Sequence, residues 1–163
     1  MRKLTLYLET SVPNALLADS TPERQRATER LFEELRQGVH EAAVSDLVIQ
    51  ELAQAPQGIR ERLMEAVGSA SPVRLTVEAA ALDLADEFVA MGLIPARYVA
   101  DARHLACAIV GEVDALVSWN LRHIVRLRTR REANAVAVLR GYRPIEICTP
   151  EEVVGSAQSG ADS

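Results

Sequence analysis

Short apolar runs alternate along this chain with longer segments of helical periodicity. In the longer segments, apolar residues recur at spacings of three and four, which predicts amphipathic helices. The short runs are rich in β-prone residues, which predicts strands. The expected strands are 4–8, 42–45, 73–76, 115–118 and 145–148. The expected helices are 22–36, 46–54, 56–67, 77–91, a helix that begins at 95 or 96, helical segments that end at 139, and a final turn from 150.

Two of these helices have clear sequence signals at their ends. Ser20-Thr21-Pro22-Glu23 combines a capping hydroxyl, a proline at the first helical position and an acid soon after. We expect that helix to end near Gly38. Thr149-Pro150-Glu151-Glu152 has the same combination, with the spacing of a capping box. It predicts the start of the last helical turn.

The alternation of strands and helices predicts a three-layer α/β/α sandwich with a mostly parallel sheet. In such sheets, ligands bind beyond the carboxyl ends of the strands. We expect residues 1–155 to form one domain, which suits a chain of 163 residues. Residues 156–163 are small and polar, and we expect a disordered tail there.

Composition narrows the class of protein. Hydrophobic residues make up 48% and charged residues 25%, which are globular values. No apolar run approaches the length of a membrane span, and the run after Lys3 is short and meets Glu9, so we expect no signal peptide. Cys107 and Cys148 lie in an apolar helix and an apolar strand. We interpret them as small buried hydrophobes in a reducing cytoplasm.

Two acids fall within apolar helical stripes. Asp101 borders the stripe that continues through Leu105, and Glu51 lies four residues after Leu47 in the preceding part of the chain. A carboxylate on a packed face is costly unless a partner compensates it. Each acid also has a structural interpretation: Asp101 favours the first turn of its helix, and Glu51 would pair with an arginine at the rim of the core.

Polar residues also follow two of the predicted strands. Glu9 comes directly after the first strand, and Asn120 follows the strand over 115–118. Glu9, Glu51, Asp101 and Asn120 are therefore candidates to converge at one edge of the sheet. Three carboxylates would repel one another, and Mg²⁺ or Mn²⁺ would remove that repulsion and activate water for phosphoryl chemistry. The alternatives are that Glu9 is a solvated loop acid and that Asn120 caps the following helix.

A basic segment follows Asn120. Although the net charge is −5, residues 120–143 contain seven arginines and one acid. An arginine stripe on an acidic protein is typical of a phosphate-binding surface, and the alternative interpretation is a solvated helix face.

Four further polar residues have two interpretations each. His104 and His123 are interpreted as packed or surface histidines. Thr10 and Ser11 would either orient a metal-bound water or cap a turn.

These residues resemble the motifs of the PIN-domain family, especially the VapC-like toxin ribonucleases. The resemblance covers about residues 3–153. It rests on Leu6-Tyr7-Leu8-Glu9-Thr10-Ser11-Val12, Ser45-Asp46-Leu47-Val48-Ile49-Gln50-Glu51-Leu52, Asp101-Ala102-Arg103-His104-Leu105-Ala106, Leu116-Val117-Ser118-Trp119-Asn120-Leu121-Arg122-His123-Ile124, Gly141-Tyr142-Arg143-Pro144-Ile145-Glu146-Ile147 and Thr149-Pro150-Glu151.

The resemblance implies a three-layer fold and Mg²⁺- or Mn²⁺-dependent cleavage of RNA. It further implies a homodimer and, for a toxin, a small antitoxin protein whose peptide lies across the active site. By position, Glu9, Glu51 and Asp101 are the expected metal ligands, with Asn120 as a fourth catalytic residue. The expected substrate-binding residues are Thr10, Ser11, Arg122, His123 and Arg126.

Two positions depart from the family pattern. Glu9 stands where the family usually has Asp, and Asn120 where it often has Asp. A second reading therefore stays open: a PIN-fold protein with weak or no turnover that binds RNA or a partner peptide. A third class, an aspartate-nucleophile phosphatase, requires an Asp after the first strand, where this chain has Glu9.

Overall fold

The computed structural model describes residues 2–17 and 19–161, without the side chains of 156–161. Its strands are β1 (Thr5–Leu8), β2 (Glu41–Ser45), β3 (Val73–Leu75), β4 (Ala115–Val117) and β5 (Glu146–Cys148). Its helices are α1 (Ser11–Asn14), α2 (Pro22–Arg36), α3 (Asp46–Leu52), α4 (Gln57–Ser69), α5 (Ala79–Ala90), the 3₁₀ helix η1 (Ala96–Tyr98), α6 (Val99–Val110), α7 (Leu127–Leu139) and α8 (Pro150–Ala161).

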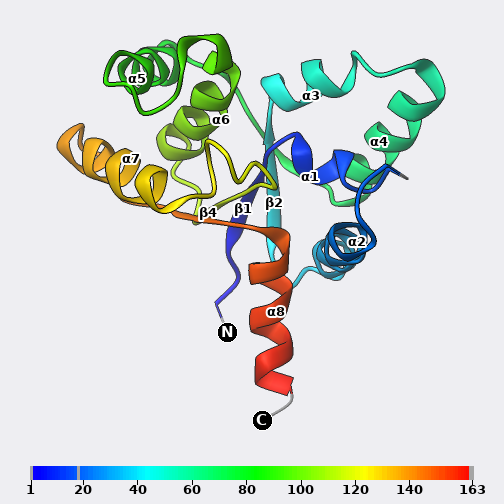
Figure 1. The fold of residues 1–163 in the computed structure, drawn as a ribbon. Coiled ribbons are helices and arrows are strands. Elements are labelled where there is room, and N and C mark those ends of the chain that lie inside the picture. Colours follow the sequence, from blue (N-terminus) through cyan, green and yellow to red (C-terminus); the bar gives the residue numbers. More distant parts are fainter. Residues whose placement is uncertain (1, 18, 162–163) are drawn as a thin grey trace.

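The strands form one parallel sheet in the order β3-β2-β1-β4-β5. Helices α5, α6 and α7 lie on one side of this sheet, and α1, α2, α3 and α4 lie on the other (Figure 1). This arrangement confirms the predicted three-layer α/β/α sandwich. Because all strands run in the same direction, their carboxyl ends meet at one edge of the sheet.

The central strand is buried on both faces. Leu6, Tyr7 and Leu8 have no exposed surface, as expected for a strand covered by helices on each side. On α2, the apolar face formed by Ala27, Leu31 and neighbouring residues packs into the same core. The apolar face that the sequence pattern predicts for α2 is therefore the face that packs against the core.

The ends of α2 agree with its sequence signals. Thr21 is the N-cap, and its Oγ1 accepts the Arg24 N–H at 3.3 Å. Pro22 is the first helical residue, and Gly38 lies just past the end with a φ of 79°, a conformation that favours glycine.

Two local features differ from the prediction. Ser11–Asn14 forms the short helix α1, which no pattern of periodicity indicated because four residues are barely one turn. The segment before α6 is the 3₁₀ turn Ala96–Tyr98, so α6 begins at Val99 rather than at 95 or 96. Both features lie close to predicted site residues.

The carboxyl-terminal segment is described only in part. α8 continues to Ala161, while the side chains of 156–161 and residues 162–163 lie outside the described residues. The predicted disordered tail over 156–163 therefore stays a prediction. No helix in the described part of the chain has the length and apolar character that crossing a membrane requires.

Candidate active site

The candidate site lies at the carboxyl edge of the two central strands. Glu9 directly follows β1, and Ser118 directly follows β4, its hydrogen-bonded neighbour. The Glu9 N–H donates to the Val117 carbonyl oxygen at 3.1 Å, so the ladder continues one residue past β1. The backbone of the sheet thus fixes where both side chains emerge.

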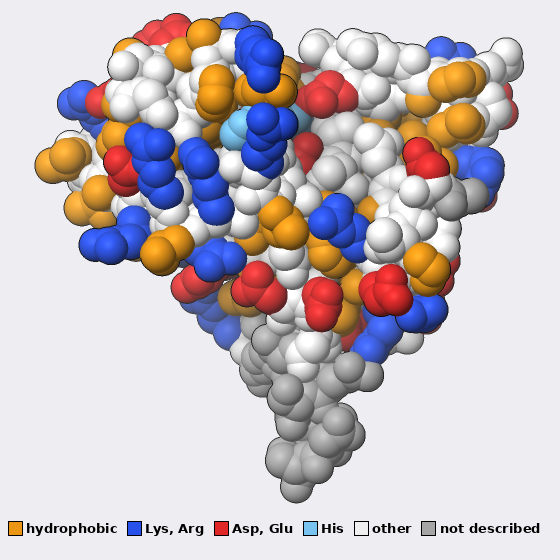
Figure 2. Space-filling view, viewed as in Figure 1, with side chains coloured by type: hydrophobic (Ala, Val, Ile, Leu, Met, Phe, Trp, Pro, Cys, Tyr) orange, Lys and Arg blue, Asp and Glu red, His pale blue; other side chains and the backbone are white. Residues whose placement is uncertain are grey.

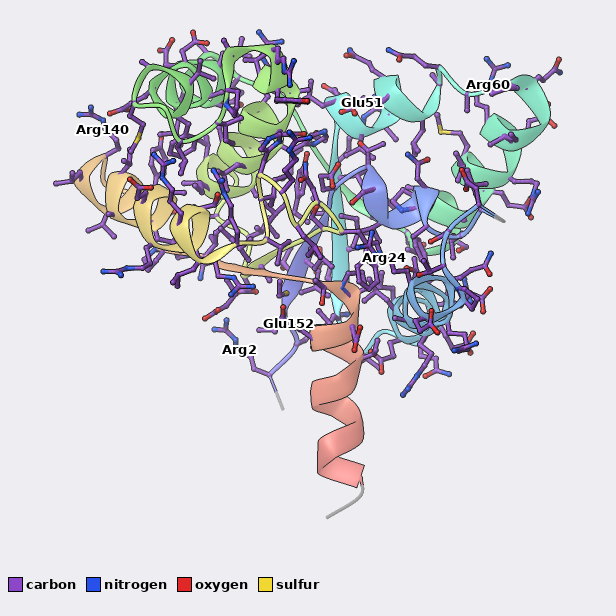
Figure 3. The ribbon with its side chains drawn as sticks, in the orientation of Figure 1. Arg2, Arg24, Glu51, Arg60, Arg140 and Glu152 are labelled. Atoms are coloured by element: carbon purple, nitrogen blue, oxygen red, sulfur yellow. The ribbon has the colours of Figure 1, made fainter. Side chains whose placement is uncertain are left out.

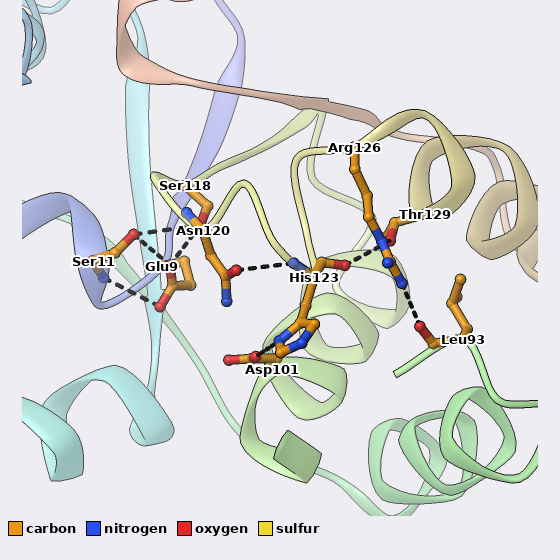
Figure 4. Close-up of polar contacts among 9 residues, drawn as sticks. All are labelled: Glu9, Ser11, Leu93, Asp101, Ser118, Asn120, His123, Arg126 and Thr129. Atoms are coloured by element: carbon orange, nitrogen blue, oxygen red, sulfur yellow. Dashed lines mark hydrogen bonds and ion pairs between the residues drawn. The ribbon is translucent and has the colours of Figure 1, made fainter. Parts of the chain in front are cut away.

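Three hydrogen bonds hold the Glu9 carboxylate (Figure 4). Its Oε1 accepts the hydroxyls of Ser11 and Ser118, each at 2.6 Å, and its Oε2 accepts the Ser11 N–H at 3.1 Å. The residue is only 6% exposed. Glu9 is therefore a buried and oriented carboxylate, and its alternative interpretation as a solvated loop acid is wrong.

Asn120 lies beside this carboxylate and closes a turn. Its N–H donates to Ser118 Oγ at 2.9 Å, and its Oδ1 accepts the His123 N–H at 3.0 Å. The side chain thus caps the turn that follows it. The predicted helix cap is wrong, because the next helix, α7, begins at Leu127 and has Arg126 as its N-cap. Within residues 2–17 and 19–161, the amide nitrogen of Asn120 has no hydrogen-bond partner.

Asp101, in the first turn of α6, pairs with His123. Asp101 Oδ2 lies 2.9 Å from His123 Nδ1, and the carboxylate side chain is 19% exposed. The Tyr98 ring packs on the other side of this contact, with its centroid 4.4 Å from that of the His123 ring. The turn after β4 and the start of α6 are thereby joined at the site.

Glu51, on α3, pairs with the buried His104 of α6. His104 Nε2 contacts Glu51 Oε1, and the side chain of His104 is 1% exposed. Its Nδ1 lies 2.8 Å from the Tyr7 hydroxyl, which is 2.7 Å from Ser45 Oγ. A continuous polar chain therefore runs from the Glu51 carboxylate into the core.

The three candidate acids all act on His104. Burial lowers the pKa of its imidazole, but the Glu51 hydrogen bond and the charges of Glu9, Glu51 and Asp101 outweigh burial and raise that pKa. Burial also raises the pKa of Tyr7 well above its ordinary value, so its hydroxyl stays neutral. The negative charge of all three acids therefore acts on this buried imidazole.

The oxygen donors of this site suit a hard divalent cation. Carboxylates, a carboxamide and hydroxyls are the groups that Mg²⁺ and Mn²⁺ prefer. Within residues 2–17 and 19–161, however, no group of three or more His, Cys, Asp or Glu side chains is arranged to hold a metal ion. Glu51 and Asp101 each contact a histidine instead, and a bound cation would have to share or replace those contacts.

The predicted substrate-binding residues occupy different environments. Ser11 orients Glu9, and His123 is bound to Asp101. Thr10 Oγ1 is buried and has no hydrogen-bond partner in the described structure. Arg126 donates to the Leu93 carbonyl oxygen at 2.5 Å and to Thr129 Oγ1 at 2.9 Å, so it ties the start of α7 to the segment that follows α5. The assignment of these residues to substrate stays a prediction.

Most of the arginine stripe is already neutralised. Positive side chains gather over the α6 and α7 half of the surface, beside acidic groups and a histidine near the centre (Figure 2). Several of them pair with carboxylates, and Arg140 does so at the far end of α7 (Figure 3). These pairs are Arg128–Glu132, Arg130–Glu152, Arg140–Glu87 and Arg143–Asp114. The predicted phosphate footprint is therefore weaker than the count of arginines suggested.

Sequence reasoning missed the roles of three residues. His104 was weighed only as a packed or surface histidine, Ser118 was given no role, and Tyr7 was placed only in a strand. His104 follows Asp101 by three positions on one helix, which puts the two on neighbouring positions of α6 and was the available signal. Nothing in the spacing shows that His104 meets Glu51, because 53 residues separate them.

The cysteines agree with their structural interpretation. Both are free thiols, Cys107 buried and Cys148 half-buried. Burial raises the pKa of Cys107 to about 11 and that of Cys148 to about 12. The thiols are therefore protonated and unreactive near neutral pH.

Comparison with known proteins supports the fold. No protein-family model and no curated protein sequence matches this chain. The crystal structure of VapBC2 from Rickettsia felis, bound to a DNA fragment from their promoter, matches with a TM-score of 0.51 and 14% identity. That match covers 90% of this chain and 98% of the other. VapBC-5 from Mycobacterium tuberculosis matches over the same shares with 18% identity and a TM-score of 0.45, too low to add support. The fold-level resemblance predicted from the motifs is thereby confirmed.

Proposed function

We propose that this chain is a metal-dependent endoribonuclease of the PIN, VapC-like type that hydrolyses RNA phosphodiester bonds. The observation that carries the proposal is the oriented, buried Glu9 at the carboxyl end of β1, with Glu51 in contact with the buried His104 and Asp101 three residues before His104 on α6. Glu9 is buried and the side chains of Glu51 and Asp101 are partly buried, and removing carboxylates from water without cationic partners is unfavourable for stability. A role in holding a divalent cation explains why they are placed there.

The proposed cofactor is Mg²⁺ or Mn²⁺, held by Glu9, Glu51 and Asp101 with Asn120 beside them. When bound, such a cation lowers the pKa of a coordinated water and stabilises charge on a phosphoryl group. The serine hydroxyls keep Glu9 oriented before any cation arrives. Of the proposed substrate-binding residues, Thr10 offers an unpartnered hydroxyl and Arg122 an exposed guanidinium. Ser11, His123 and Arg126 shape the site around them.

We further propose that the protein is the toxin of a toxin–antitoxin pair. The support is the likeness in fold to a chain of a VapBC complex. A small antitoxin protein is then the expected partner, together with a second copy of this chain in a homodimer. Both the target RNA and the antitoxin would be met in the cytoplasm.

A second candidate is a PIN-fold protein that binds RNA or a partner peptide without cleaving it. The observation that favours it is the engagement of two of the acids, Glu51 with His104 and Asp101 with His123. If those contacts persist, Glu51 and Asp101 offer a cation only the oxygens that the histidines leave free. A Mn²⁺ titration followed by thermal denaturation separates the two candidates: a Mn²⁺-dependent rise in Tm favours the nuclease.

The first experiment is cleavage of a labelled single-stranded RNA in Mn²⁺, Mg²⁺ or EDTA by the wild type and Asp101→Ala. We expect cleavage in Mn²⁺ or Mg²⁺, none in EDTA, and a loss of at least about a hundredfold in the variant. Equal cleavage by both proteins would indicate a contaminating nuclease. A folded wild type that binds RNA without cleaving it in any metal would favour the second candidate.

A further inference from the structure

Three arginines near the acids contact aromatic rings rather than carboxylates. The guanidinium carbon of Arg24 lies 5.1 Å from the centroid of the Trp119 ring. Those of Arg97 and Arg122 lie 4.9 Å and 5.9 Å from the centroid of the Tyr98 ring. In the described part of the chain, no ion pair joins any of the three to a carboxylate. Their positive charge is therefore not neutralised within the protein.

The residue whose ring holds Arg24 is hydrogen-bonded through its backbone to the Glu9 side of the site. The backbone N–H of Trp119 donates to Ser11 Oγ at 2.8 Å, and that hydroxyl donates to Glu9 at 2.6 Å. The indole N–H of Trp119 donates instead to Thr28 Oγ1 at 2.9 Å, on the same helix as Arg24. Arg24 itself comes from α2 and lies near the centre of the view, below Glu51 (Figure 3). Arg24 thus lies over the side chain of a residue whose backbone bonds the serine that orients Glu9.

The ring that holds Arg97 and Arg122 adjoins the Asp101 side. Tyr98 packs against the His123 ring, which is bound to Asp101. Glu9 and Asp101 lie on different sides of Asn120 in the close-up (Figure 4). Arginines without a carboxylate partner therefore lie on rings of residues linked to the partners of both acids, through Ser11 for Glu9 and through His123 for Asp101.

This placement addresses the electrostatic problem of an acidic site that acts on a polyanion. RNA phosphates are repelled by Glu9, Glu51 and Asp101 unless positive charge lies close by. An aromatic contact keeps the full charge of a guanidinium and orients its plane, leaving the N–H groups for phosphate oxygens. A carboxylate partner, such as Glu87 for Arg140, occupies those same groups.

We propose that Arg24, Arg97 and Arg122 form a two-sided clamp for the RNA backbone. Arg24 binds a phosphate on the Glu9 side of the cleaved bond, and the pair on Tyr98 binds a phosphate on the Asp101 side. The clamp rests on the proposed function and assigns its substrate contacts to these arginines. The carboxylate-paired arginines of α7 contribute little.

The clamp is tested by RNA binding in EDTA, where no cleavage occurs. Arg24→Gln, Arg97→Gln and Arg122→Gln are compared with Arg128→Gln and Arg140→Gln, which change the net charge equally. Fluorescence anisotropy of a labelled single-stranded RNA gives Kd at several salt concentrations. We expect each clamp variant to weaken binding about fivefold and to reduce the salt slope by about 0.7. The control variants should stay within about twofold.

Trp119 provides a second readout, since it is the sole tryptophan of the chain. Its fluorescence should change when RNA binds the wild type and should change much less in Arg24→Gln. Thermal denaturation of each variant checks that the fold is retained. Tyr98→Leu should weaken binding as much as either of the arginines that its ring holds.

The outcomes separate the clamp from the proposed function. Equal weakening by clamp and control variants would indicate a general charge effect and overturn the clamp, as would unchanged binding in all three clamp variants. Mn²⁺-dependent cleavage by the wild type would leave the nuclease standing in either case. A wild type that neither binds nor cleaves RNA would overturn both.

Discussion

The acids at the two edges of the sheet have different kinds of partner. At the amino-terminal edge, Asp114 precedes β4 and accepts the Thr5 N–H at 2.7 Å. Its carboxylate also pairs with Arg2 at 2.7 Å and with Arg143 at 3.3 Å. At the carboxyl edge, the partners of Glu51 and Asp101 are histidines, and those of Glu9 are serines and a backbone N–H.

The difference separates a structural acid from candidate functional acids. Asp114 ties the starts of β1 and β4 together and is compensated by permanent cations. Within residues 2–17 and 19–161, no arginine or lysine forms an ion pair with the carboxylate of Glu9, Glu51 or Asp101. That edge keeps negative charge available, which is what a divalent cation requires.

The largest expected effect is that of Glu9→Gln, which preserves shape and one acceptor oxygen but removes the charge. We expect Mn²⁺-dependent RNA cleavage to fall by at least about a hundredfold and the rise of Tm in Mn²⁺ to disappear. Asp114→Asn is the matched control and should cleave at the wild-type rate. Wild-type cleavage by Glu9→Gln would remove this carboxylate from the proposed site.

A smaller effect is expected from His104→Gln, measured by urea denaturation in EDTA. Because the folded pKa of His104 is raised, its contribution to stability is fully present below about pH 6.5. It is lost as pH rises through the folded pKa. The variant should lose about 2 kcal/mol below pH 6.5 and less at higher pH.

The partner of His104 offers a second, independent test of the same contact. Glu51→Gln keeps an acceptor for the imidazole while removing the charge that favours its protonation. The dependence of stability on pH should therefore flatten in both variants. A wild-type pH dependence in His104→Gln would show that another group carries it.

Asp114→Asn should lower the free energy of unfolding by about 1 kcal/mol at pH 7. The Thr5 N–H, and then Arg2 and Arg143, hold the pKa of this carboxyl below its ordinary value. Its contribution is present above about pH 4 and lost as pH falls through the folded pKa. The stabilities of wild type and variant should become equal as the pH is lowered, which an acid titration followed by circular dichroism measures. The two edges of the sheet are thus expected to respond to pH in opposite directions.

The smallest effect is expected on α7. Arg128→Gln removes an exposed pair with Glu132 and should change the free energy of unfolding by less than about 0.5 kcal/mol. Urea denaturation at low and high salt measures this change. A larger loss, screened by salt, would show that the charges of α7 stabilise the fold as a network.

The elements were more predictable from sequence than the contacts between them. Strand and helix positions follow from local periodicity and caps, as at Thr21 and Pro22, so the layered fold was accessible. Strand order was not, since no local signal states that β1 lies between β2 and β4. Nor was α1, because one turn containing Pro13 carries no periodicity.

The candidate site was predictable as a set of residues and not as a geometry. Glu9, Glu51, Asp101 and Asn120 were named from strand ends and apolar stripes. The serine contacts of Glu9 and the histidine contacts of the other acids depend on long-range packing. Ser118, for instance, reaches Glu9 across 109 residues of sequence. Residue spacing within one element carries no information about such a pair.

The central position of β1 affects the order of events during synthesis. β1 is synthesised before both of its neighbours, and of these β2 follows it sooner than β4, so one edge of β1 has to wait for β4. Ser118, Trp119 and Asn120 arrive later still. A nascent chain therefore holds Glu9 without the hydroxyl and the turn that complete its surroundings. For the proposed nuclease, this order of synthesis would delay activity until β4 and the turn after it have been made.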